Sequence, residues 1–84
     1  MTNDDRVARL RRLGELLYGE RWQSDMAAAL SGEAGRTIRQ GQVSTWLGGH
    51  RPMPEWTDAA LARIAAMGAA RLRRQADEAE ALFG

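Results

Sequence analysis

The sequence predicts an all-α fold, a small bundle of helices with a long C-terminal helix. Three observations predict it. Apolar residues recur at spacings of three and four in successive stretches, which is the period of a helix with one buried face. Glycine or proline separates these stretches. The chain has 84 residues, which suits one small domain with no room for a second core.

The first helix is predicted to begin near Asp4 or Asp5, whose carboxylates suit the positive end of the helix dipole. Residues 1–4 are polar, and we expect them to be frayed. Gly14 interrupts the helix and indicates a close contact with another helix, and Gly19 is a suitable terminator. The buried stripe steps along one face as Val7, Leu10, Leu13 and Leu17.

The second helix is predicted to open within Glu20–Asp25, with Ser24 or Trp22 as its cap, and to end at Ser31–Gly32. Its small residues, Ala27–Ala29, would let another helix approach closely, as a sharp corner between two helices requires.

The third helix is predicted over Gln40–Leu47, after a loop at Glu33–Arg39 that tucks Ile38 into the core. Gly48–Gly49 would end it, because glycine adopts left-handed conformations without a Cβ clash. A helix this short is unstable alone in water, so its apolar face must be held by the rest of the chain. That face consists of Val43, Trp46 and Leu47.

The last helix is predicted to be capped by Thr57 or Asp58 and to reach Phe83, either as one helix or broken near Met67–Gly68. We treat residues 1–84 as a single domain and 57–84 as a C-terminal helical extension suited to dimerisation. A dimer seam through the extension would use Leu72, Leu82 and Phe83. Two opposite-charge pairs at i, i+4 are expected along it, Arg73–Asp77 and Arg74–Glu78.

Composition excludes several classes of function. There is no cysteine and one histidine, so we expect no metal site, no disulfide and no catalytic residues. No phosphate loop, nucleophile–histidine pair or paired carboxylates are apparent, so we predict neither an enzyme nor a cofactor, and no small-molecule ligand is evident. The longest apolar runs are too short for a bilayer, and the N-terminus does not resemble a secretory signal. We therefore expect a cytoplasmic protein without a membrane partner.

The charge distribution is more informative than the net charge of +1. No acidic residue occurs from Ala34 to Pro54, whereas acidic residues are frequent on both sides of this segment. Four basic or titratable residues lie within it, namely Arg36, Arg39, His50 and Arg51. A local basic stripe on a nearly neutral protein favours a polyanion bound at one face.

Two motifs, taken together and in order, resemble a known family. The first is Trp22-Gln23-Ser24-Asp25-Met26-Ala27, followed by Leu30. The second is Val43-Ser44-x-Trp46-x-x-Gly49-x-Arg51-x-x-Pro54. They resemble the helix-turn-helix of the Cro/CI-type (XRE) repressor family over roughly residues 7–66. Ala27 and Val43 lie farther apart here than in the family, so the turn between the two helices must be longer.

The resemblance implies a lambda-repressor-like fold and a homodimer that binds double-stranded DNA at an inverted repeat. The recognition helices would enter successive major grooves about 34 Å apart. Glutamine, serine and threonine can bond base edges, so the expected base readers are Gln40, Gln42, Ser44 and Thr45. Gln23 is expected to bind a phosphate, and three arginines are expected to bind phosphates or to reach bases at the flanks, namely Arg36, Arg39 and Arg51. The implied function is a transcriptional regulator, most simply a repressor that controls its own operon.

One alternative keeps the helical fold without DNA binding, as a protein-interaction adaptor or inhibitor of phage or plasmid type. The acidic residues near both ends of the chain favour it. Each single feature also has a structural explanation, because surface arginines are often merely solvated and the tryptophans can serve packing alone.

Overall fold

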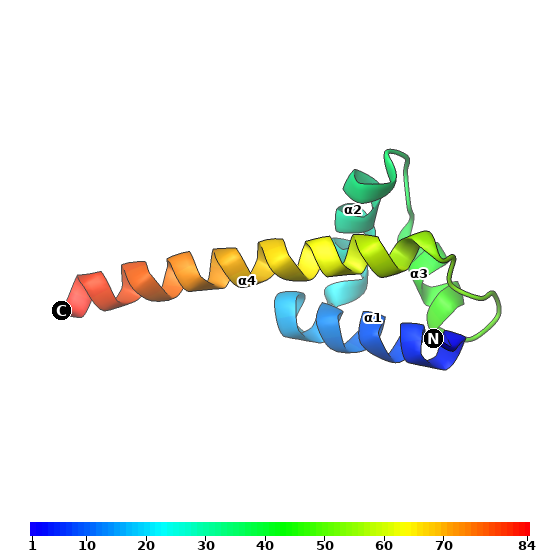
Figure 1. The fold of residues 1–84 in the computed structure, drawn as a ribbon, viewed down its shortest axis with the longest axis horizontal. Coiled ribbons are helices and arrows are strands. Elements are labelled where there is room, and N and C mark those ends of the chain that lie inside the picture. Colours follow the sequence, from blue (N-terminus) through cyan, green and yellow to red (C-terminus); the bar gives the residue numbers. More distant parts are fainter.

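A computed structural model describes residues 1–84 and confirms the all-α fold, with no strands. None of its helices combines the length and the apolar character needed to cross a membrane. The first two helices pack against the N-terminal half of the fourth, and the third packs against the first two. The C-terminal half of the fourth helix extends past all of them (Figure 1). The four helices are α1 (Asn3–Tyr18), α2 (Trp22–Ala34), α3 (Gln40–Leu47) and α4 (Trp56–Phe83).

One hydrophobic core draws on all four helices and on the loops that flank α3. Its central side chains are wholly or almost wholly removed from solvent, which supplies the main driving force for folding. The members with the lowest exposure include Leu10 of α1, Met26 and Leu30 of α2, Val43 and Trp46 of α3 and Ala60 of α4. Ile38 lies in this core, as the sequence predicted, and Met53 joins it from the loop after α3.

The N-terminus of α1 is tied down, so the prediction that residues 1–4 fray is wrong. Thr2 and Asp5 form a capping box in which each side chain accepts a hydrogen bond from the other's backbone amide. The side-chain oxygen of Asn3 accepts a hydrogen bond of 2.8 Å from the backbone amide of Met53. The helix therefore begins at Asn3, slightly earlier than predicted, and ends as predicted before Gly19, whose φ is +79°.

Gly14 marks the contact between α1 and α2, as its position predicted. It is buried, and a Cβ atom at this position would lie 2.1 Å from Cε3 of Trp22. The indole of Trp22 therefore packs directly on the backbone of α1. Only glycine leaves room for this approach.

The predicted end of α2 at Ser31–Gly32 is wrong, because the helix continues to Ala34 and closes at Gly35, with φ +68°. The Ser31 hydroxyl lies 2.8 Å from the carbonyl of Ala27 and accepts a bond of 2.7 Å from the amide of Ile38. This contact anchors the following loop to the last turn of the helix. Because α2 continues to Ala34, the loop begins at Gly35 and is shorter than the predicted Glu33–Arg39. The N-cap of α2 also differs from the prediction, since Arg21 is the N-cap and neither Trp22 nor Ser24 occupies that position.

The last helix is unbroken from Trp56 to Phe83, with Glu55 as its N-cap, so neither predicted cap residue serves as one. Thr57 is fully buried, and its hydroxyl donates a 2.6 Å hydrogen bond to the carbonyl of Pro54. Asp58 instead forms a two-pronged ion pair with Arg6 of α1, in which the guanidinium nitrogens lie 2.9 Å from its two oxygens. Asp58 therefore binds a residue of another helix and does not cap α4.

The Arg6 hydrogen bonds hold the pKa of Asp58 below its usual value, and reciprocally raise the pKa of Arg6. The pair stabilises the fold above the ordinary titration range of a carboxyl group, and this contribution is lost as the pH falls through the lowered pKa.

The predicted intrahelical pairs are absent. The structure contains two ion pairs, Arg6–Asp58 and Arg63–Glu33, and neither Arg73–Asp77 nor Arg74–Glu78 is formed. Exposed pairs of this kind gain only a few tenths of a kcal/mol, about what ordering their long side chains costs.

Candidate nucleic-acid interface

The polar face that is predicted to contact DNA belongs to α3, whose bounds match the predicted Gln40–Leu47. Val43 is fully buried and Trp46 is 2% exposed, so two side chains fix this eight-residue helix to the core. The Trp46 ring also meets the Trp56 ring edge-on, with centroids 6.4 Å apart. Leu47 is half-buried against the same core. The rest of the helix surface therefore turns away from the core in a fixed orientation.

Four predicted base readers occupy this outward surface to different degrees. Gln40 and Ser44 are exposed, whereas Gln42 and Thr45 are half-buried. The Thr45 hydroxyl donates a 2.8 Å hydrogen bond to the carbonyl of Gly41 in the preceding turn, so its proton is already engaged. The side chains of the other three have no hydrogen-bond partner within the protein, and their donors and acceptors are open to a ligand.

Arginines flank α3 at both ends. Arg39 is its N-cap residue, without a side-chain capping bond, and Arg51 lies in the loop that leads to α4. Both are exposed, and neither takes part in an ion pair of the protein. Their charges remain uncompensated beside a helix that carries no carboxylate, as a phosphate contact requires.

Arg36 is placed differently. Its guanidinium carbon lies 5.8 Å from the centre of the Trp56 ring, a cation–π distance, at the start of α4. Trp56 in turn meets Trp46 edge-on, so a series of contacts leads from Arg36 at the surface through Trp56 to Trp46 in the core. The structure therefore gives Arg36 a packing role beside α4, which the sequence did not suggest because the two residues lie on separate elements.

Gln23 lies on a different helix from the other predicted site residues. It is the second residue of α2 and half-buried. The N-cap of α2, Arg21, makes no side-chain bond to the first amides, so these donors and the positive end of the helix dipole remain available to an anion. This is the environment that the phosphate role of Gln23 requires.

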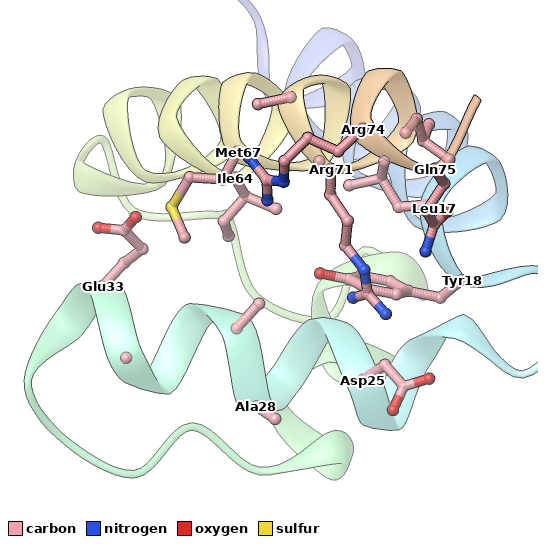
Figure 2. Close-up of a pocket in the computed structure, with 15 residues that line it drawn as sticks. Leu17, Tyr18, Asp25, Ala28, Glu33, Ile64, Met67, Arg71, Arg74 and Gln75 are labelled. Carbon is pink, nitrogen blue, oxygen red and sulfur yellow. The ribbon is translucent and has the colours of Figure 1, made fainter. Parts of the chain in front are cut away.

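A groove of about 1110 Å³ runs between α2 and α4, and no residue of α3 lines it. Figure 2 shows Tyr18 and Arg71 reaching toward each other across it, with Asp25 and Glu33 on the α2 side. Burial is the main cause that raises the pKa of Tyr18. Asp25 and Glu33 are eight residues apart on α2, which is about 12 Å of helix rise. No group of three or more histidine, cysteine, aspartate or glutamate side chains could hold a metal ion.

The chain matches no protein-family model, no curated protein and no solved structure. The likeness to the Cro/CI-type family therefore remains a prediction from the motifs alone.

Proposed function

We propose that this protein is a sequence-specific DNA-binding transcriptional regulator that inserts α3 into the major groove. The supporting observation is the surface of α3, which is polar, free of carboxylates, flanked by unpaired arginines and fixed from behind by Val43 and Trp46. The major groove is about 12 Å wide and admits one helix. A rigid scaffold beneath a short reading helix is the arrangement used by helix-turn-helix proteins.

In this proposal the side chains divide into readers and positioners. Gln40 and Gln42 are suited to bidentate bonds with adenine, and the Ser44 hydroxyl can bond several bases. Arg39 and Arg51 bind phosphates on either side of the groove, and Gln23 binds another at the N-terminus of α2. Thr45 contributes mainly contact surface, because its hydroxyl proton is held within α3.

The proposed protein acts as a homodimer on an inverted repeat and represses by occupying a promoter, its own among the candidates. No chemical step is involved. Binding at two symmetric half-sites would compensate for the small contact area of one eight-residue helix.

Replacing Arg51 by alanine should weaken binding to all duplexes alike, because a phosphate contact carries no sequence information. The slope of log K against log salt concentration should become shallower by about one unit. The measurement is a fluorescence titration at several salt concentrations, with a duplex that the wild-type protein selects from random sequence. Arg74→Ala, which removes an exposed arginine from the far part of α4, should change neither quantity. An unchanged affinity and slope for Arg51→Ala would rule out its phosphate role.

Replacing Gln42 by alanine should cost about 1–3 kcal/mol on the selected duplex and relax specificity at one position. The loss should shrink on duplexes altered at that position, which distinguishes base reading from general weakening. Arg74→Ala again serves as the control, because it removes an exposed side chain from the far part of α4. Equal losses on every duplex would contradict the reading role.

A protein-interaction adaptor is the second candidate, favoured by the apolar residues that α4 exposes beyond the core, among them Phe83 at 94%. A gel shift at two salt concentrations separates the two functions. A repressor gives a tight complex with a steep salt dependence, and an adaptor gives neither.

A further inference from the structure

The C-terminal half of α4 meets the rest of the chain only at its start, where Arg71, Leu72, Arg74 and Gln75 line the groove opposite α2. Every residue from 71 to 84 is exposed, and Figure 1 shows this half projecting past the ends of α1 and α2. The radius of gyration is 14.3 Å, compared with about 12 Å for a compact domain of this length. The longest dimension is 50 Å and the other two are 24 and 23 Å.

Beyond Gln75, no residue of α4 lines the groove or packs on another helix. A helical segment of a few turns is marginal in water unless it packs on something. It also presents large apolar side chains to solvent, with Leu72 at 52%, Leu82 at 75% and Phe83 at 94% exposure. Exposed apolar surface on an otherwise charged helix indicates an interaction site.

Four apolar residues of this half form a narrow stripe along one side, and Leu82 lies about 60° outside it. Leu72, Ala76, Ala79 and Phe83 follow one another at spacings of four, three and four, which is the a/d repeat of a coiled coil. At 100° per residue they span a sector of about 60° that contains no charge. Two alanines at the middle of the stripe would let a second helix approach closely.

The charges beside the stripe indicate that a second copy of this chain binds it. Arg73 and Glu80 border the same edge of the stripe and are seven residues apart, so they occupy equivalent heptad positions. Neither has an ion-pair partner in the chain. A second copy that runs antiparallel would place its Glu80 beside Arg73 and its Arg73 beside Glu80, so the edge is complementary to itself.

We propose that two copies of this protein pair antiparallel through the C-terminal halves of α4. Leu72 packs on Phe83 of the second copy, and Ala76 packs on Ala79 of the second copy. Both pairs share one two-fold centre, between Asp77 and Glu78. The isologous geometry of a two-fold dimer requires such a common centre.

This pairing has a consequence that rests on the proposed function. α3 lies near the N-terminal end of α4, where Trp46 contacts Trp56 (Figure 1). From Trp56 to the two-fold centre is about 32 Å of helix, so the two copies of α3 would stand about 65 Å apart. This separation is close to two turns of DNA rather than one, and it revises the half-site spacing implied by the family resemblance.

Sedimentation equilibrium of the full chain without DNA tests the interface. The wild-type protein should show a concentration-dependent mass that approaches two chains. Ala76→Glu places a carboxylate in the middle of the stripe and should reduce the mass to one chain. Residue 76 is exposed, so the helical content of the monomer should be retained. Ala81→Glu is the matched control on the opposite side of the helix, and it should sediment like the wild type.

Charge reversal tests the antiparallel direction. Arg73→Glu and Glu80→Arg should each weaken association by tenfold or more, because like charges then meet across the interface. The double reversal should restore association, since each new carboxylate again faces an arginine of the second copy. A parallel pair would not bring these positions together and would show no such restoration.

A wild-type protein that stays at one chain at every concentration would overturn the proposal, as would a dimer that tolerates Ala76→Glu. If a different protein binds the stripe, the wild-type chain alone should stay monomeric at every concentration. Sedimentation without DNA tests only the dimer, so a negative result would not affect the proposal that α3 binds DNA, which the titrations test. A dimer that binds no duplex would refute the proposed function but not the dimer.

Discussion

Trp46→Ala is expected to destabilise this protein by about 3–5 kcal/mol, the usual cost of removing a large aromatic ring from a core. Small domains have total stabilities near the lower end of about 5–15 kcal/mol, so a large part of the population should be unfolded at ambient temperature. The measurement is urea unfolding followed by far-UV circular dichroism. The midpoint should fall sharply, or the folded baseline should be lost.

The loss of stability should be this large because few other side chains hold α3 against the core. It is 2% exposed, and together with Val43 it holds α3, a helix too short to persist by itself. Its loss also removes the edge contact to Trp56, on which Arg36 stacks. Trp46→Phe keeps an aromatic ring in the site and should lose clearly less stability. Equal midpoints for Trp46→Ala and the wild type would show that other contacts hold α3.

Where apolar spacing and helix-ending residues agreed, the sequence predicted the structure well. The bounds of α3 and the end of α1 at Gly19 are confirmed, because each combines a periodic apolar face with a glycine that ends it. The exposed face of α3 followed from the same period, since burial of Val43 and Trp46 leaves Gln40 and Ser44 outward.

The predictions failed where a distant contact outweighs a local signal. Gly32 and Gly35 are both possible helix ends, and the hydrogen bond that the Ile38 amide donates to the Ser31 hydroxyl accompanies the extension past Gly32. Asp58 had the chemistry of a cap, but Arg6 lies beside it in the fold, although far away in the sequence. The position of Arg36 over Trp56 likewise depends on packing between elements, which a single sequence does not reveal.

Gly14→Ala is expected to destabilise the protein by about 1–3 kcal/mol, even though alanine is the better helix former. The added Cβ would lie 2.1 Å from Cε3 and 2.4 Å from Cδ2 of Trp22, so the indole would have to move. Trp22 is 5% exposed within the core, and its displacement would disturb the packing of α2 against α1. Thermal unfolding followed by circular dichroism should show a lower midpoint.

Gly32→Ala is the matched control, and its effect should have the opposite sign. Gly32 also lies inside a helix, but a Cβ there would meet no atom within 4 Å. The substitution should therefore stabilise the protein by about 0.5–1 kcal/mol through helix propensity alone. The two variants would then differ by about 1.5–4 kcal/mol for one identical change in covalent structure. Shifts of the same sign would mean that Trp22 does not pack on Gly14, and that α1 and α2 approach each other differently.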